Sequence, residues 1–206
     1  MKYDLVIWDI DGTLLNTENG LVCAYQYTID KLNLPTKSVD EIKSFIGPIP
    51  KTVFMKQFAM TPDKAQEASD IFRNRYKNHD LLKAYPYNGI LEVLQYIKSQ
   101  GIKQAVATNK RQDYALDICK YFGIDSFCEP ILGPDNITSK TKADLIKDCI
   151  SATNAKKAVM IGDTDGDKQA AENAGADFIG VNYGFGFDDV EGYANVSSEI
   201  LKKLEI

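Results

Sequence analysis

Four short apolar runs, separated from one another by segments of helical pattern, constrain the fold of this chain most. They have the length of strands and lie at residues 5–8, 105–107, 158–161 and 178–181. Continuous apolar runs of this length are typical of strands buried on both faces, as in a parallel sheet. Helices between such strands supply the crossover connections. The pattern predicts an α/β fold, with a Rossmann-like parallel sheet core flanked by helices.

Apolar residues at helical spacing predict the elements that connect these strands. The expected helices of the core are residues 89–100, 113–122, 142–152 and 167–174. Gly101, Gly123 and Gly175 each follow one of these helices, and glycine is common just past the end of a helix. These glycines therefore predict the C-terminal ends of three of the helices.

A long stretch between the first strand and residue 85 has helical spacing and no strand-like run. Its expected helices are residues 21–32, 39–45, 52–58 and 62–79. The stretch is too long for a loop, and turn signals such as Gly47-Pro48-Ile49-Pro50 divide it, so it predicts an inserted helical bundle. We expect a helical cap domain at residues 16–85 and a Rossmann-like core at residues 1–15 and 86–206.

The composition argues against several classes of partner. The 206 residues include 24 Lys and Arg and 29 Asp and Glu, for a formal charge of -5. Nucleic acids and anionic membranes attract clustered Lys and Arg, and no apolar run reaches the roughly 20 residues of a membrane span. Four cysteines lie far apart without a CxxC pair, as expected of free thiols in a reducing compartment. We expect a cytoplasmic monomer or weak homodimer that binds neither nucleic acid nor membrane.

Polar side chains follow three of the expected strands. In chain order they are Asp9, Asp11, Thr108, Asn109, Asp163, Asp165 and Asp167. Lys142 begins the helix between the second and third of these strands. Ligands of open α/β sheets bind beyond the carboxyl ends of the strands, so these side chains should converge on one crevice.

Carboxylates gathered at one edge of a sheet repel one another and imply a bound cation. Magnesium fits best, because it takes one or two carboxylates and keeps its other positions for water and phosphate oxygens. The spacing of residues around Asp9 and Asp163 does not fit a calcium-binding loop. Counted from Asp9 or Asp163, its sixth position would be Leu14 or Lys168, where such a loop has glycine.

These residues lie in four motifs whose order resembles the haloacid dehalogenase-like hydrolases, in a helical-cap group resembling phosphoglycolate phosphatase and β-phosphoglucomutase. The motifs read Asp9-Ile10-Asp11-Gly12-Thr13-Leu14, Ala107-Thr108-Asn109, Lys142 and Gly162-Asp163-Thr164-Asp165-Gly166-Asp167. The resemblance covers nearly the whole chain. It implies a magnesium-dependent phosphatase that acts on a small phosphorylated metabolite.

The resemblance also implies the roles of the motif residues. Asp9 would attack phosphorus and form an aspartyl phosphate, and Asp11 would be the general acid and base. Asp9, Asp163 and the backbone carbonyl of Asp11 would bind the metal. Thr108 and Lys142 would hold the phosphoryl oxygens.

Several roles stay open within this scheme. Asn109 would lie beside the bound phosphoryl group. Asp167 is expected either as a metal ligand or as the partner that orients Lys142. Asp165 is either a supporting acid or a solvated turn residue, and Lys140 is the alternative to Lys142.

In the expected cap, Gly47 and Lys51 would bind substrate, because this loop faces the active site in relatives. A lysine there suits an anionic substrate, although an exposed solubilising lysine fits equally well. The Gly184-Phe185-Gly186 stretch lacks the lysine and the third glycine of a phosphate loop, so it predicts a mobile turn.

Two other functions remain open. A small-sugar phosphomutase could use the same Asp9 and Asp11 to return the phosphoryl group to a second hydroxyl, if the cap excludes water. A protein that only binds a phosphometabolite is the second alternative, although the intact motifs speak against it. The sequence does not choose among phosphoglycolate, a nucleoside monophosphate, pyrophosphate and a sugar phosphate as substrate.

Overall fold

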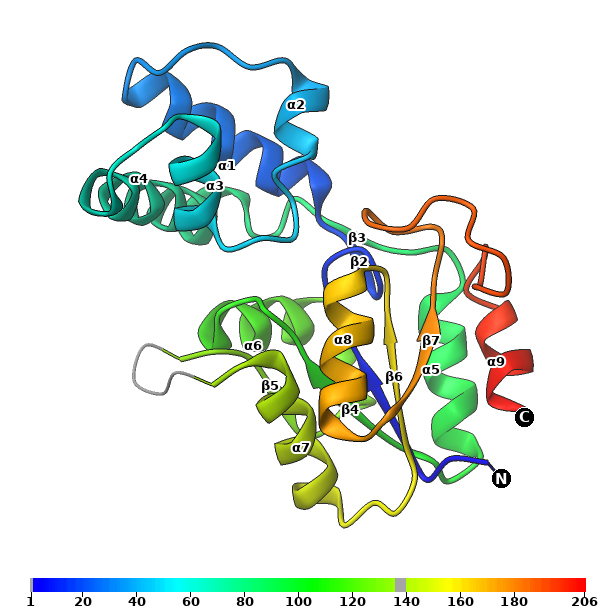
Figure 1. The fold of residues 1–206 in the computed structure, drawn as a ribbon. Helices are drawn as coiled ribbons and strands as arrows, with labels where there is room; N and C mark the ends of the chain where they lie inside the picture. Colours follow the sequence, from blue (N-terminus) through cyan, green and yellow to red (C-terminus); the bar gives the residue numbers. More distant parts are fainter. Residues whose placement is uncertain (1, 136–139) are drawn as a thin grey trace. The chain divides into compact units, whose positions relative to one another are not determined.

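The computed structural model describes residues 2–135 and 140–206, which form two compact units (Figure 1). One unit combines Met1–Asn16 with Tyr85–Ile206, and the other is Thr17–Ala84. The second unit is therefore a single stretch of chain inserted into the first. Among the described residues, no helix has the length and apolar character needed to cross a membrane.

Within the described residues, the first unit contains a parallel sheet of five strands in the order β5-β4-β1-β6-β7. The strands are β1 (Leu5–Trp8), β4 (Lys103–Ala107), β5 (Ile131–Leu132), β6 (Ala158–Gly162) and β7 (Asp177–Gly180). Every residue of β1 is buried, as the apolar run predicts for the central strand. The predicted α/β fold with a parallel, Rossmann-like sheet is confirmed.

Helices cover both faces of this sheet (Figure 1). They are α5 (Ile90–Ser99), α6 (Gln112–Tyr121), α7 (Lys142–Thr153), α8 (Asp165–Ala174) and α9 (Glu199–Leu204). On one face, Leu5 and Ile7 of β1 pack in a core cluster with Ile146 of α7 and Ala171 of α8. On the other, the Trp8 indole donates to Gln104, whose amide donates to the Leu94 carbonyl of α5. Burial on both faces fixes the register of the central strand.

Several features differ from the sequence prediction. The strand β5, the short antiparallel pair β2 (Leu15–Asn16) and β3 (Tyr85–Pro86), and α9 were not predicted. Helix α8 begins two residues earlier than expected, because the Thr164 side chain accepts from the Asp167 N–H in a capping box. The helix expected over 62–79 is α4 (Pro62–Arg75) followed by a π-helical turn (Tyr76–Asp80).

The Thr17–Ala84 unit is helical and packs around aromatic side chains. Besides α4 it contains α1 (Glu18–Lys31), α2 (Val39–Lys43) and α3 (Pro50–Gln57). The Tyr25 ring lies 5.5 Å from Phe45, 5.8 Å from Phe54 and 4.3 Å from Phe72, measured between centroids. These large apolar rings, from α1, α3, α4 and the turn that follows α2, give the unit its own core.

A buried carboxylate lies at the end of the π-helical turn. The Asp80 side chain is fully buried and forms ion pairs with Arg75 Nε at 2.6 Å and Lys83 Nζ at 2.8 Å. Burial alone would raise the pKa of Asp80, but the hydrogen bonds from Arg75 and Lys83 outweigh it and hold the pKa below its usual value. The charged carboxylate therefore stabilises the end of this unit.

Candidate active site

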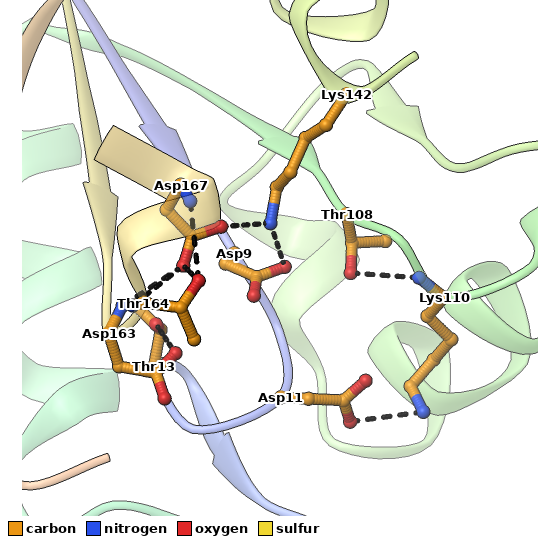
Figure 2. A network of polar contacts seen from close by, with 9 residues as sticks. All are labelled: Asp9, Asp11, Thr13, Thr108, Lys110, Lys142, Asp163, Thr164 and Asp167. Atoms are coloured by element: carbon orange, nitrogen blue, oxygen red, sulfur yellow. Dashed lines mark hydrogen bonds and ion pairs between the residues drawn. The ribbon is translucent and has the colours of Figure 1, made fainter. Parts of the chain in front are cut away.

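Asp9 directly follows the central strand β1, and its backbone N–H donates to the Ile161 carbonyl of β6 at 3.0 Å. This bond holds Asp9 in line with the strand. Its side chain is buried, and its Oδ1 lies 2.9 Å from Lys142 Nζ (Figure 2). The predicted nucleophile thus has a cationic partner at the carboxyl end of the sheet.

Lys142 is the first residue of α7, and local hydrogen bonds fix its position. Thr141 and Asp144 form a capping box, in which the Asp144 N–H donates to Thr141 Oγ1 and the Thr141 N–H donates to Asp144. The helix start is therefore set by residues outside the site. The buried ammonium of Lys142 contacts Asp167 Oδ1 as well as Asp9.

Asp163 and Asp167 lie on either side of the turn from β6 into α8. Asp163 Oδ1 accepts from Thr13 Oγ1 at 3.0 Å, and Asp163 Oδ2 accepts from the Phe185 N–H at 2.7 Å. Asp167 Oδ2 accepts from Thr164 Oγ1 at 2.7 Å and from the N–H groups of Thr164 and Asp163. Both oxygens of Asp167 are thus engaged, one by this turn and one by Lys142.

Burial and mutual repulsion shift the pKa values of these groups. Burial raises the pKa of Asp9 to about 6, although the charge of Lys142 acts in the opposite direction. Burial and the charge of Asp9 raise the pKa of Asp163 to about 7. Burial would lower the pKa of Lys142, but the charges of Asp167 and Asp9 outweigh it and raise that pKa above its usual value. Lys142 therefore stays charged.

Three buried carboxylates gather negative charge that a hard divalent cation would balance. One oxygen each from Asp9, Asp163 and Asp167 lies within 4.8 Å of the others, and all three side chains are buried. Together they exceed the charge of the Lys142 ammonium, so a further cation would relieve their repulsion. Carboxylate oxygens are also the ligands that such cations prefer.

Two glycines let the backbone approach Asp163 closely. A Cβ on Gly12, whose φ is +81°, would lie 2.1 Å from Asp163 Oδ2. A Cβ on Gly184 would lie 2.3 Å from the Asp163 Cβ and 2.4 Å from the Gly12 carbonyl oxygen. The stretch containing Gly184 was predicted as a mobile turn rather than a phosphate loop. It packs on Asp163, and the Phe185 N–H donates to that carboxylate.

Asp11 and Thr108 are joined by a residue that the sequence prediction missed. The Lys110 N–H donates to Thr108 Oγ1 at 3.2 Å, and Lys110 Nζ lies 3.0 Å from Asp11 Oδ1 (Figure 2). Thr108 itself is held by its own N–H, which donates to the Leu132 carbonyl of β5. The signal available in the sequence was a lysine one residue after Thr108-Asn109, at a strand end that faces carboxylates.

The remaining predicted residues are exposed or belong to the Thr17–Ala84 unit. Asn109 and Asp165 are exposed, Asp165 in the first turn of α8. Lys140 is exposed and pairs with Asp148 at 2.6 Å, away from Asp9. Gly47 and Lys51 belong to the Thr17–Ala84 unit, with Lys51 in the first turn of α3.

Known proteins share this sequence and fold. The family model for haloacid dehalogenase-like hydrolases matches residues 6–181. A phosphoglycolate phosphatase of Thiobacillus denitrificans is 32% identical over 87% of this chain and 83% of its own. A 5'-nucleotidase of Pseudomonas aeruginosa is 29% identical over 92% and 87%. A crystal structure from Clostridium acetobutylicum, described as a predicted phosphatase, superposes with a TM-score of 0.91 at 29% identity over 100% of both chains. The chain therefore belongs to the haloacid dehalogenase-like hydrolase family.

Proposed function

We propose that this protein is a magnesium-dependent phosphatase that hydrolyses a small phosphorylated metabolite through an aspartyl phosphate on Asp9. The observation that carries the proposal is the contact of the buried Lys142 ammonium with both Asp9 and Asp167. A carboxylate nucleophile beside a fixed cation, at the end of the central strand, suits phosphoryl transfer. The names of the relatives, a phosphoglycolate phosphatase and a 5'-nucleotidase, support the same reaction class.

Asp9, Asp163 and the backbone carbonyl of Asp11 would hold the magnesium ion. When bound, magnesium would neutralise part of the carboxylate charge and polarise a phosphoryl oxygen. We assign Asp167 to the orientation of Lys142, because its Oδ1 contacts that ammonium and its Oδ2 accepts three hydrogen bonds from the turn. The sequence left this role and that of a metal ligand open for Asp167.

In the first step, an Asp9 carboxylate oxygen attacks phosphorus. The bond from phosphorus to the leaving oxygen breaks, and its electron pair goes to that oxygen, which takes a proton from the Asp11 carboxyl group. The products are the free alcohol and an aspartyl phosphate. Lys142 and the Thr108 hydroxyl would bind the equatorial phosphoryl oxygens, with Asn109 beside them.

In the second step, a water oxygen attacks the aspartyl phosphate and gives a proton to the Asp11 carboxylate. The bond between phosphorus and the Asp9 oxygen breaks, and its electron pair returns to Asp9. Inorganic phosphate leaves, and Asp11 is again protonated for the next cycle. The phosphoryl group therefore passes from the ester to Asp9 and then to water, and no other reactant is needed.

We further propose that Thr17–Ala84 acts as a cap that selects the substrate, with Gly47 and Lys51 as contacts. Gly47 is exposed and has a φ of +110°, and Lys51 is partly buried at the start of α3. A lysine in that position suits a substrate with a second anionic group, such as a carboxylate or a nucleotide phosphate.

Phosphate release tests the proposal. The purified protein is mixed with p-nitrophenyl phosphate and with a panel that includes phosphoglycolate, a 5'-nucleotide, pyrophosphate and a sugar 1-phosphate. Release should need magnesium, stop with a chelator, and disappear in Asp9→Asn. Asp148→Asn, which alters an exposed ion pair with Lys140, is the matched control and should keep the activity.

Two further readouts separate the alternatives. Acid quenching during turnover should leave phosphate on Asp9, detectable by mass spectrometry of peptides. A phosphomutase would instead convert the sugar 1-phosphate into the 6-phosphate without net release. Full activity of Asp9→Asn would rule out the nucleophile assigned here.

A further inference from the structure

Lys110 contacts two of the proposed catalytic residues with two different groups. Its backbone N–H donates to Thr108 Oγ1, and its Nζ lies 3.0 Å from Asp11 Oδ1. The first contact uses an acceptor site of the Thr108 hydroxyl, which leaves the hydroxyl proton to point toward another acceptor. The second fixes one oxygen of the Asp11 carboxylate. Thr108 and Asp11 are therefore tied to the same residue.

The Lys110 side chain is buried, and burial is unfavourable for an unpaired cation. It is 3% exposed, whereas the Asp11 side chain is 22% exposed. An ammonium that leaves water loses its hydration and needs close anionic partners. Surface lysines of this chain form their ion pairs while keeping contact with water, as Lys2 does with Glu205 at 2.8 Å. The buried Lys110 ammonium is thus held in one place.

Asp11 needs such a constraint for the reaction proposed above. A carboxyl group that must protonate a leaving oxygen and later deprotonate water has to stay within hydrogen-bond reach of both. Asp11 is only partly buried, and rotation of its side chain would take the carboxyl group out of this reach. The ion pair to a rigid, buried partner restricts that rotation.

We propose that Lys110 is a positioning residue that holds the Asp11 carboxyl group in place for proton transfer to and from the substrate. The inference rests on the proposed phosphatase function. Removal of the Lys110 ammonium should therefore slow the reaction of esters with a basic leaving group. Their P–O bond breaks only as the leaving oxygen takes the proton from Asp11. Breakage of the bond to a weakly basic leaving group should hardly change.

The test compares phenyl phosphate with p-nitrophenyl phosphate, because the two esters have similar shapes and p-nitrophenolate is the weaker base. The value of kcat/KM reports steps up to loss of the alcohol. In Lys110→Met, with magnesium present, kcat/KM for phenyl phosphate should fall by about 10- to 100-fold, within the range of general acid catalysis. For p-nitrophenyl phosphate it should fall less than about threefold.

Three variants control the comparison. Lys110→Arg keeps the cation and should restore most of the phenyl phosphate activity. Asp11→Asn should show the same dependence on the leaving group, and the double variant Lys110→Met with Asp11→Asn should be no worse than Asp11→Asn alone. Lys2→Met removes an exposed paired lysine and should change neither ester. Circular dichroism melts show which variants are folded.

The outcomes separate the two proposals. If the parent protein hydrolyses neither ester nor any of the phosphorylated metabolites, the proposed function fails. If the parent is active and folded Lys110→Met loses both esters equally or neither, the positioning role is wrong. Should Lys110→Met fail to fold, Lys110→Arg and the double-variant comparison with Lys110→Gln give the same readout.

Discussion

The Nζ atom of Lys142 lies 2.9 Å from Oδ1 of Asp9 and also contacts Asp167, so a buried cation touches the proposed nucleophile and its own orienting partner. Lys142→Met should lower kcat by about 100- to 1,000-fold, the cost of removing a charge-stabilising group. Lys140→Met, two residues earlier and paired with Asp148 at the surface, should keep the parent kcat. Steady-state kinetics check both, and loss of activity in Lys140→Met alone would reverse the assignment.

Magnesium should stabilise the folded protein more at higher pH. The raised pKa values of about 6 for Asp9 and about 7 for Asp163 mean that the metal-free fold binds protons more tightly than the unfolded chain. The metal-free protein should therefore lose stability as pH rises from about 4 through 7. Protons and magnesium compete for the same oxygens.

Thermal melts at pH 5 and pH 8, with and without magnesium, measure this effect. Saturation at 100 times the dissociation constant corresponds to about 2.7 kcal/mol of stabilisation. Asp163→Asn should abolish the increase in melting temperature that magnesium causes, whereas Asp148→Asn should retain it. An equal shift at both pH values would contradict the linkage.

Asp80→Asn should destabilise the protein in a way that depends on pH. The pKa of Asp80 is held below its unfolded value of 3.8, so its contribution is complete above that value and is lost as pH falls through the lower folded pKa. At pH 7 the free energy of unfolding should drop by about 1–3 kcal/mol, because charged hydrogen bonds from Arg75 and Lys83 are weakened.

Urea unfolding at pH 7, 5 and 3 gives the comparison for Asp80→Asn. The difference in free energy of unfolding between parent and variant, called the gap below, should stay constant from pH 7 to 5 and narrow at pH 3. Asp117→Asn, at an exposed position of α6, should show no gap. A gap that widened in acid would have the wrong sign for a carboxylate stabilised in its charged form.

Gly184→Ala should impair the site more than the rest of the fold. The added methyl group would lie 2.3 Å from the Asp163 Cβ and 2.4 Å from the Gly12 carbonyl oxygen, so Asp163 or the loop must move. We expect about 1–3 kcal/mol of destabilisation from the overpacking and at least about a tenfold loss of kcat/KM. Gly166→Ala, whose nearest contact is Thr164 Oγ1 at 3.5 Å, should melt like the parent.

The sequence predicted those parts of the fold that depend on burial and repeat at a regular spacing. Strand β1 is a continuous apolar run and helices α5 to α8 carry apolar residues at helical spacing, so their existence and type followed from the pattern. Strand β5, with two residues, is too short to show a period. It exists because the β4 backbone supplies partners, with Val106 N–H donating to the Pro130 carbonyl.

The candidate site also contains residues that the sequence predicts and contacts that it does not. Asp9, Asp163 and Lys142 could be predicted because each follows a strand or begins a helix, where the topology of a parallel sheet places it. Lys110 also follows a strand, but its contact with Asp11 depends on a distance across loops, as does the contact of Phe185 with Asp163. The Phe185 N–H, in particular, carries no side-chain signal and reaches Asp163 only through the close packing that Gly184 allows.

The short pairing of β2 with β3 bears on how this chain can change. Asn16 and Tyr85 lie opposite each other in that pair, so the chain leaves the sheet-containing unit and returns to it at adjacent points. An insert whose ends are already joined can lengthen, shorten or be replaced by another without altering the strand order of the host. We therefore expect the 68 residues from 17 to 84 to be exchangeable as one piece. A chimaera that carries a relative's module between Asn16 and Tyr85 should retain the parallel sheet.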